Sequence, residues 1–508
     1  MSEALGAEAT VAVVGCGTMG GGIAQVAAGA GHRVRLYDVR PEAVEAAVQG
    51  VRARLEAAVA RGRRSREEVR ALLARLQPAS SLAELADARL VIEAVAEELA
   101  VKRELFLRLE EVVDAEALLA SNTSSLSITA IQAGLRRPER MLGLHFFNPA
   151  PAMRLVEVVC GLATAEETAG RAAATMRRWG KEPIRVRNTP GFVVNRVARP
   201  FYGEGLALLA EGIAQPATLD AIYRDCGGFR MGPCELTDLI GQDVNAAVSR
   251  ALFVAYRYDR RYLPPLIQEE LVEAGRLGRK SGRGFYDYGP GAVRPAPQEE
   301  PPGPPARALV VEGPPGPLAP WVALAERRGL AVRRQEGSGL LAVGEAVLVA
   351  ADGRSAGERA LVLGRPVVAV DLCLDAETAP RVALAASPDL SGDARSRVAG
   401  FFQTLGKRVS FVADLPGMVV LRTVAMLANE AAEAVREGVA SAEDVDRALC
   451  LGANYPLGPL AWAERVGIER LVACLDRLER HYRDPRYRCS PWLRRELVRR
   501  RLVARERR

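Results

Sequence analysis

Short apolar runs alternate with amphipathic stretches over the first 190 residues of the chain. The runs read TVAVVG, RVRLYD, RLVIEAV, ALLAS, MLGLH and RLVEVV, and each has the length of a β-strand. Several of the stretches between them carry apolar residues at helical spacing. Strands that alternate with helices are typical of an α/β domain with a largely parallel sheet. We expect this first domain to span residues 8–188.

A pair of helices is expected after the second apolar run. From Pro41 the pattern predicts a helix to about Ala60, and the next four residues, RGRR, form a turn. Ser65 and Glu68 then have the S-x-x-E spacing of a capping box, which indicates the start of the second helix. Arginines at this turn could cover a phosphate-bearing substrate, or they could simply form a solvated charged turn.

Residues 189–288 are predicted to form a helical domain. The segment Thr189–Arg196 begins a long apolar helix, with Pro190 at the favoured first turn. Asn195 lies on the apolar face of this helix, where an amide without hydrogen bonds would cost stability. It is therefore either a buried structural amide or a substrate contact.

The rest of the chain has the same organisation. Residues 289–305 are rich in proline and glycine and are expected to be a linker. Residues 306–414 again alternate short strands with helices, and residues 415–508 are predicted to be helical. The expected order is therefore an α/β domain, a helical domain, a linker, a second α/β domain and a second helical domain.

An internal repeat relates the two helical regions. The segment 189–194, TPGFVV, recurs as LPGMVV at 415–420, and the same offset of 226 pairs Gly180-Lys181 with Gly406-Lys407. Chance does not hold such a register over some sixty residues, so we infer that the helical domain is duplicated. Both copies keep an apolar face that must be covered. We hypothesise that residues 415–480 pack on residues 190–288 as an internal pseudo-dimer, and the whole chain could in addition form a homodimer.

Length and composition restrict the class of protein. With 508 residues the chain is too long for one core, and its apolar content of 49% with a mean hydropathy of +0.01 is typical of a soluble globular protein. No apolar run reaches the length of a membrane span, and the first residues do not form a secretory signal. We therefore expect a cytoplasmic protein with no membrane partner. The eight cysteines form no C-x-x-C pair, which predicts free thiols and no metal site.

The net charge of +7 and the pI of about 9.1 could indicate nucleic acid or a polyanionic small molecule as a partner. The basic residues are spread along the chain and form no nucleic-acid motif, so no nucleic-acid partner is expected. Salt-dependent affinity for duplex DNA would be the sign of one. The chain has only four lysines, Lys102, Lys181, Lys280 and Lys407, and each has either a specific role or a chance exposed position.

A dinucleotide site is predicted at the end of the first strand. The run TVAVV leads directly into a G-x-G-x-x-G motif, a helix follows, and the second strand ends in Asp38. The glycines permit a tight turn and close approach of a pyrophosphate, while the acid binds ribose hydroxyls, as in a Rossmann-type domain. Asp38 would repel a 2′-phosphate and favours NAD over NADP, although Arg40 could accommodate that phosphate. The second α/β domain lacks this motif and is expected to be a degenerate Rossmann-like domain. The motif residues are Gly15, Gly17, Thr18, Met19 and Gly20.

Three residues in or just after other apolar runs are candidates for acid–base chemistry. His145, one of only three histidines, ends MLGLH, Ser124 follows ALLAS, and Glu157 lies inside RLVEVV. Strand ends of an open α/β sheet meet at one edge, so these groups can converge. A lone histidine is more often a packing residue than a catalyst. Together with a carboxylate and a hydroxyl, however, it suits proton transfer to or from a substrate oxygen.

These segments together resemble the 3-hydroxyacyl-CoA dehydrogenase family. The resemblance rests on VVGCGTMGGGIA, SNTSSLSI, HFFNPAP, LVEVV, TPGFVVNR and GRKSGRGFYDY over residues 10–288, and on the repeated helical domain. It is closest to the fused bacterial form that acts on 3-hydroxyadipyl-CoA or 3-hydroxybutyryl-CoA. The resemblance implies NAD-dependent oxidation of a 3-hydroxyacyl-CoA to the 3-oxoacyl-CoA, in fatty-acid or aromatic-acid (phenylacetate-type) degradation.

The resemblance also implies roles for individual residues. His145 would be the general base, Glu157 its orienting carboxylate, and Ser124 and Asn195 the hydrogen-bond donors to the reacting oxygen. The cofactor contacts implied beyond the glycine motif and Asp38 are Glu97, Lys102, Ser124, Asn148 and Lys280. Coenzyme A would be met near the turn between the paired helices, at Arg61, Arg63 and Arg64.

Two other functions remain compatible with the residues alone. An NAD-dependent dehydrogenase of free hydroxy acids or sugars could share the nucleotide domain and a helical second domain. A catalytically silent NAD-binding scaffold could share the whole fold, because fold alone does not prove function. Reduction of NAD with 3-hydroxybutyryl-CoA, but not with free 3-hydroxybutyrate, would separate the expected activity from both.

Overall fold

The computed structural model describes residues 3–506, and the chain divides into two compact units. Unit 1 comprises Met1–Arg196 and Glu437–Ala453, and unit 2 comprises Val197–Arg436 and Asn454–Arg508. Residues 1–2 and 507–508, the latter the last two of the expected fifth domain, lie outside the described residues. Over residues 3–506, no helix combines the length and apolar character needed to cross a membrane.

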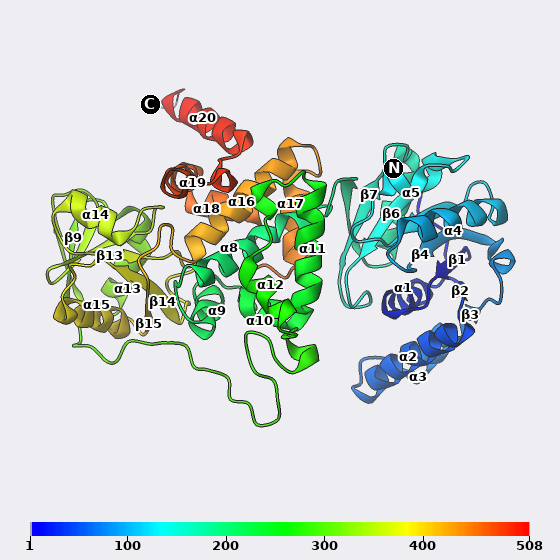
Figure 1. Ribbon diagram of the computed structural model, residues 1–508, viewed down its shortest axis with the longest axis horizontal. Helices are drawn as coiled ribbons and strands as arrows, with labels where there is room; N and C mark the ends of the chain where they lie inside the picture. Colours follow the sequence, from blue (N-terminus) through cyan, green and yellow to red (C-terminus); the bar gives the residue numbers. More distant parts are fainter. Residues whose placement is uncertain (1–2, 507–508) are drawn as a thin grey trace. The chain divides into compact units, whose positions relative to one another are not determined.

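Unit 1 is built on an eight-stranded sheet, drawn in blue to cyan in Figure 1. Neighbouring strands are parallel except β6 and β7, which run antiparallel. The predicted α/β domain is confirmed, with one antiparallel pair that the pattern did not predict. In sheet order the strands are β3 (Leu76–Pro78), β2 (Val34–Tyr37), β1 (Thr10–Val14), β4 (Ala88–Glu93), β5 (Leu118–Ser121), β6 (Met141–Phe146), β7 (Leu155–Cys160) and β8 (Glu182–Arg187).

The helices of unit 1 include α17, which comes from the second half of the sequence. Ser65 caps α3 in a capping box with Glu68, as predicted from the sequence. The helices are α1 (Thr18–Gly29), α2 (Pro41–Ala60), α3 (Arg66–Ala74), α4 (Leu99–Val112), α5 (Ile128–Gln132), α6 (Glu166–Arg178), α7 (Val194–Val197) and α17 (Ala442–Gly452), with 3-10 turns η1 (Leu82–Leu85) and η2 (Pro138–Arg140).

Unit 2 combines helices with a seven-stranded mixed sheet, drawn in yellow in Figure 1. In sheet order the strands are β10 (Ala331–Gln335), β9 (Ala308–Glu312), β11 (Leu340–Val343), β12 (Ala346–Ala350), β13 (Val367–Val370), β14 (Arg381–Ala386) and β15 (Arg408–Val412). Helices α13 (Ala319–Arg327), α14 (Ala356–Leu363) and α15 (Gly392–Thr404) and the 3-10 turn η5 (Gly316–Leu318) belong to this second α/β domain.

The remaining helices form two sets of similar order. The first set is α8 (Arg199–Ala210), α9 (Pro216–Asp225), α10 (Pro233–Ile240), α11 (Gln242–Ala255), η3 (Arg260–Tyr262), α12 (Leu266–Glu273) and η4 (Arg279–Ser281). The second is α16 (Val420–Arg436), α18 (Pro459–Val466), α19 (Ile468–Tyr482), η6 (Pro485–Tyr487) and α20 (Pro491–Glu506), with α17 in unit 1.

The expected linker, residues 289–305, contains no helix or strand. It is nevertheless tied to unit 2 by hydrogen bonds along its length. The Gln298 amide donates to Thr218 Oγ1 at 2.8 Å, and the Glu300 amide donates to Val409 O at 2.8 Å. The segment is therefore a linker without regular structure that is held on unit 2 by hydrogen bonds.

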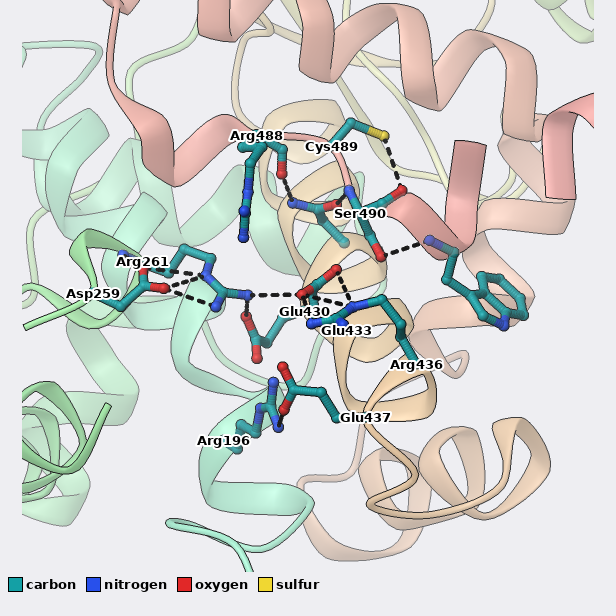
Figure 2. A network of polar contacts seen from close by, with 12 residues as sticks. Arg196, Asp259, Arg261, Glu430, Glu433, Arg436, Glu437, Arg488, Cys489 and Ser490 are labelled. Atoms are coloured by element: carbon teal, nitrogen blue, oxygen red, sulfur yellow. Dashed lines mark hydrogen bonds and ion pairs between the residues drawn. The ribbon is translucent and has the colours of Figure 1, made fainter. Parts of the chain in front are cut away.

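Helices α8 and α16 pack on each other inside unit 2. Glu430 of α16 accepts a hydrogen bond from Arg261 Nη1 at 3.2 Å (Figure 2). It accepts a second one from Tyr262 Oη at 2.6 Å. Glu204 of α8 accepts from Arg422 Nε at 2.7 Å and from Tyr487 Oη at 3.1 Å. Glu204 and Glu430 are related by the repeat offset, so each helix is held through the same glutamate by residues of the other set.

The two halves also exchange a helix. In unit 1, α17 packs on β7 and β8, and the Arg187 amide donates to Val439 O at 2.8 Å. In unit 2, α9 packs on β14, and the Ala413 amide donates to Ile213 O at 3.0 Å. Both hydrogen bonds are related by the offset of 226, because residue 187 corresponds to 413 and residue 213 to 439. Each sheet is therefore covered by a helix from the other copy.

The turn that leads into each helical region has the same unusual backbone. Gly191 and Phe192 have φ of +74° and +50°, and Gly417 and Met418 have φ of +79° and +55°. Side chains disfavour positive φ, so a helix cannot begin at such residues. Helix α7 begins at Val194, and the expected helix start at Pro190 is wrong for this reason.

A single carboxylate satisfies the amides after this turn in the second copy. Asp371 Oδ2 accepts from the amides of Val419 at 3.0 Å and Val420 at 2.8 Å, and Oδ1 accepts from Leu421 at 3.1 Å. Burial raises the pKa of Asp371 to about 6, while the amides, which favour the charged form, oppose that rise. Asp371 occupies the position that corresponds to His145 at the offset of 226.

We predict that Asp371→Ala lowers the free energy of unfolding by roughly 3 kcal/mol, because three buried amides lose their acceptor. Denaturant unfolding measures the change. Asp375→Ala is the control in the same loop, since Asp375 Oδ1 accepts from the Glu377 amide at an exposed position. Equal destabilisation by both variants would contradict this account of Asp371.

Candidate active site

His145 and Glu157 face each other across the antiparallel pair β6 and β7. His145 Nδ1 lies 2.6 Å from Glu157 Oε2, and both side chains are buried. Glu157 Oε1 accepts from the amides of Val193 at 2.9 Å and Val194 at 3.0 Å. The two oxygens of one carboxylate thus fix the imidazole and the start of α7 at the same time.

Aromatic side chains restrict the histidine ring further. The ring centroid of His145 lies 4.5 Å from that of Phe147 and 5.7 Å from that of Phe192. Phe192 is one of the two residues of positive φ in the turn before α7. With Nδ1 held by a carboxylate, Nε2 is the nitrogen that can accept or donate a proton. The arrangement is therefore chemically competent as a general base.

The other two predicted catalytic residues lie beside each other in unit 1. Asn195 Nδ2 is 3.5 Å from Ser124 O, and Asn195 directly follows the amides that Glu157 holds. Ser124 is exposed and Asn195 is half-buried, so both side chains are accessible to a ligand. Two residues 71 positions apart in the sequence thus lie next to each other.

Glu97 organises the loop that contains Ser124. Its Oε1 accepts from Thr123 Oγ1 at 2.6 Å, from the Ser124 amide at 3.0 Å and from Ser125 Oγ at 2.9 Å. Burial opposes the charge of Glu97, but the Thr123 hydrogen bond and the ammonium of Lys102 hold its pKa below the usual value. The S-N-T-S-S segment therefore folds around one carboxylate.

Lys102 lies behind this loop, with a side chain only 1% exposed. Its Nζ donates to Glu93 Oε1 at 2.6 Å and lies 3.2 Å from Glu97 Oε2. Ser121 Oγ donates to the other oxygen of Glu93 at 2.6 Å. Glu93 was not among the residues predicted for the site, although a carboxylate inside the apolar run RLVIEAV needs a buried partner. Direct contact of Lys102 with a cofactor stays a prediction.

The glycine loop has the shape that a dinucleotide needs. Gly15 has φ of +95°, and a Cβ there would meet Ala94 O at 2.5 Å. A Cβ at Gly20 would meet Gly15 O at 1.8 Å, whereas at Gly17 it would meet nothing within 4 Å. Gly15 and Gly20 therefore permit a tight turn, and Gly17 leaves the backbone open to a ligand. Thr18 and Met19 begin α1, whose N-terminus favours a pyrophosphate.

Asp38 lies beside this loop at the end of β2. Its Oδ2 accepts from the Cys16 amide at 2.8 Å, and its Oδ1 accepts from the Arg40 amide at 3.0 Å. The carboxylate is thereby fixed next to the glycine turn, where a ribose would lie. These residues fit NAD.

For two other predicted cofactor contacts, Asn148 and Lys280, the structure of residues 3–506 shows no hydrogen bond to the glycine loop or to Asp38. Asn148 is exposed in the loop after β6. Lys280 belongs to unit 2, where its Nζ donates to Asp243 Oδ2 at 2.7 Å. That either residue contacts the cofactor stays a prediction.

The arginines expected near coenzyme A lie at the exposed turn between α2 and α3. Arg64 also lines a cavity of about 400 Å³ in unit 1. Arg154, Arg178 and Lys181 line the same cavity, which gives it a positive charge. Arg61 and Arg63 do not line it, and their contact with a substrate stays a prediction.

Two of the four lysines have a structural role. Lys181 Nζ donates to the carbonyls of Ala150 at 2.6 Å and Met153 at 2.7 Å, which closes the loop after β6. Lys407 Nζ does the same after β13, where it donates to Glu377 O and Ala379 O, both at 2.7 Å. The repeat thus preserves the lysine that ties this loop.

Known proteins resemble this chain over nearly its whole length. The sequence profile of the 3-hydroxyacyl-CoA dehydrogenase NAD-binding domain matches residues 10–189, and that of the C-terminal domain matches residues 191–288 and 417–506. The profile of the 3-hydroxybutyryl-CoA dehydrogenase reduced Rossmann-fold domain matches residues 348–416. The 3-hydroxyadipyl-CoA dehydrogenase of Escherichia coli K12 is 46% identical over 483 residues, which is 95% of this chain and 96% of that protein.

The chain belongs to the 3-hydroxyacyl-CoA dehydrogenase family.

Other relatives agree with this assignment. A probable 3-hydroxybutyryl-CoA dehydrogenase of Bacillus subtilis is 44% identical over 278 residues, or 55% of this chain and 96% of that protein. The crystal structure of 3-hydroxybutyryl-CoA dehydrogenase from Escherichia coli K12 matches with a TM-score of 0.89 and 45% identity, and covers 97% of this chain and 98% of that one. This dehydrogenase is therefore an NAD-dependent enzyme, and the predicted fold class is confirmed.

We predict that Glu97 makes the stability of this dehydrogenase depend on acid pH. The pKa of Glu97 is lower in the folded than in the unfolded chain, so its contribution is present above the ordinary value of 4.5 and is lost as the pH falls through the folded pKa. The difference in unfolding free energy between the wild type and Glu97→Gln should be constant above about pH 6 and shrink at lower pH.

Denaturant unfolding at several pH values measures this difference. Glu98→Gln is the control, because Glu98 is the exposed neighbour and its side chain does not cap α4. A difference for Glu97→Gln that is independent of pH would contradict the role of its carboxylate.

Proposed function

We propose that this dehydrogenase oxidises a 3-hydroxyacyl-CoA to the 3-oxoacyl-CoA, with His145 as general base. The observation that carries the proposal is the hydrogen bond between His145 Nδ1 and Glu157 at 2.6 Å. It fixes the tautomer in which Nε2 accepts the hydroxyl proton, and it stabilises the imidazolium that forms. NAD, when bound, supplies the hydride acceptor. In the reverse direction the imidazolium is the acid.

Ser124 and Asn195 complete the proposed chemistry. The Ser124 hydroxyl and the Asn195 amide can donate to the substrate oxygen as its charge changes. Their proximity, at 3.5 Å between Asn195 Nδ2 and Ser124 O, supports a shared role. Glu97 holds the loop of Ser124, and Glu157 holds the segment of Asn195. Both donors are therefore fixed before the substrate binds.

The substrate class rests on the relatives and on charge. The names 3-hydroxyadipyl-CoA and 3-hydroxybutyryl-CoA dehydrogenase favour a short or carboxyl-terminated acyl group, in aromatic-acid or fatty-acid degradation. The basic residues Arg61, Arg63 and Arg64 at the turn after α2, with the cavity that Arg64 lines, suit the phosphates of coenzyme A. A cytoplasmic location is part of the proposal, and the eight free cysteines support it.

A substrate panel tests the activity. NADH absorbance is followed with 3-hydroxybutyryl-CoA, 3-hydroxyadipyl-CoA and free 3-hydroxybutyrate, and only the CoA esters should be oxidised. Turnover of the free acid alone would indicate a hydroxy-acid dehydrogenase. NAD binding without turnover of any ester would indicate a scaffold and would overturn the proposal.

We predict that His145→Gln lowers turnover at least about a hundredfold, the usual loss when a general base is removed, with NAD affinity nearly unchanged. Glu157→Gln should also lower turnover. Its oxygen can still accept from Val193 and Val194, but its NH₂ group would face His145 Nδ1 and favour the tautomer protonated at Nε2. Steady-state kinetics and NAD titration measure both effects. Near-normal turnover of His145→Gln would exclude it as the base.

We also propose that the second helical domain takes the place of a partner subunit, as an internal pseudo-dimer. Support comes from the reciprocal contacts, in which α17 covers β7 and β8 while α9 covers β14. Such reciprocity is the property of an isologous contact. A further homodimer of the whole chain stays a prediction that light scattering can test.

We predict that a fragment of residues 1–290 homodimerises or aggregates, because it lacks α17 and exposes the apolar surface of β7. Size-exclusion chromatography with light scattering measures its mass, with the full chain at the same concentration as control. A soluble, fully active monomer at high concentration would contradict the pseudo-dimer.

A further inference from the structure

We propose that residues 437–453, which belong to the second half of the sequence, position the catalytic segment of the first half. The proposal rests on the function proposed above, in which Asn195 donates to the substrate oxygen. The contact that carries it is the ion pair of Arg196 with Glu437, and both residues are positioning residues.

Arg196 is the residue directly after Asn195, and its side chain is fully buried. Its Nη1 donates to Glu437 Oε2 at 2.7 Å (Figure 2). Its backbone amide donates to Gly191 O at 3.1 Å, which closes the turn of positive φ. The guanidinium therefore anchors the turn and Asn195 to residue 437.

The same segment is held from its other side. Val194, directly before Asn195, gives its amide to Glu157 Oε1 at 3.0 Å. Gly452, at the end of α17, lies so close that a Cβ there would meet Val194 Cγ2 at 3.0 Å and Leu155 Cδ2 at 2.7 Å. Asn195 is thus clamped between the carboxylate of its own sheet and a helix of the second copy.

Such a clamp matters because donors to a reacting oxygen act only at the right distance. A displacement of about 1 Å can lower a rate on the order of a hundredfold. If Glu437 loses its charge, the buried guanidinium of Arg196 loses this ion pair. We expect residues 191–196 to shift so that the guanidinium becomes better solvated. The position of Asn195 would change with it.

The repeat provides a matched control. At the offset of 226, Arg196 corresponds to Arg422 and Glu437 to Glu211. Arg422 Nη2 donates to Glu211 Oε1 at 2.7 Å, and in both pairs the arginine side chain is 0% exposed and the glutamate 26%. Leu421 replaces Asn195 in this copy, so the second ion pair has no catalytic neighbour, and its Arg422 also donates to Glu204 at 2.7 Å.

The test compares Glu437→Gln with Glu211→Gln in the full chain. Both variants should lower the unfolding midpoint, but only Glu437→Gln should lower kcat, by about ten- to a hundredfold, with the KM for NAD unchanged. Glu437→Asp, which keeps the charge, should recover part of the rate. If Glu437→Gln is not recovered folded, Glu437→Asp is compared with Glu211→Asp, and the same ranking is expected.

A double-mutant cycle separates positioning from general destabilisation. In an Asn195→Ala background, Glu437→Gln should lower kcat no further, because the residue that it positions is absent. Equal loss of kcat in Glu211→Gln and Glu437→Gln, or losses that multiply in the double variant, would overturn the inference. A wild-type chain that oxidises no 3-hydroxyacyl-CoA would instead overturn the proposed function.

Discussion

Two buried amides, those of Val193 and Val194, lie where the first α/β domain passes into the helices, and a buried N–H group without an acceptor costs about 1–3 kcal/mol. Glu157 supplies the acceptor with one oxygen and holds His145 with the other. The second copy has the same requirement, and Asp371 meets it from the position that corresponds to His145. The fold therefore needs a carboxylate in both copies. The proposed chemistry needs the histidine in the first copy alone.

This constraint explains what the duplicated half has kept and lost. It lacks the glycine loop and has Asp371 at the position of His145, two features on which the proposed reaction depends. It has kept the lysine that ties the loop after β13, the turn of positive φ and the residues that contact the first half. Its helix α17 covers β7, the strand that carries Glu157. The second half thus supplies residues 437–453, which pack inside the unit that contains His145 and Glu157.

Much of this could be predicted from the sequence, since it depends on local spacing. The glycine motif, Asp38 and the strand ends at His145 follow from patterns over a few residues, and the offset of 226 indicates the duplication. The helix start at Pro190 could not be predicted, because a positive φ at Phe192 has no sequence signature. Glu93, a carboxylate in an otherwise apolar strand, needs a buried partner, but the sequence does not specify that Lys102 is this partner. The exchange of α17 depends on pairing between segments more than 200 residues apart, which spacing does not encode.

The central claim is that the chain has two copies of one architecture and a single chemical site. Isothermal titration of the full-length protein with NAD tests it most directly, because it counts cofactor sites per chain. The account predicts one NAD for each 508-residue chain, bound at the loop of Gly15 and Gly17. A stoichiometry of two would show that the second α/β domain also binds the cofactor and would contradict it.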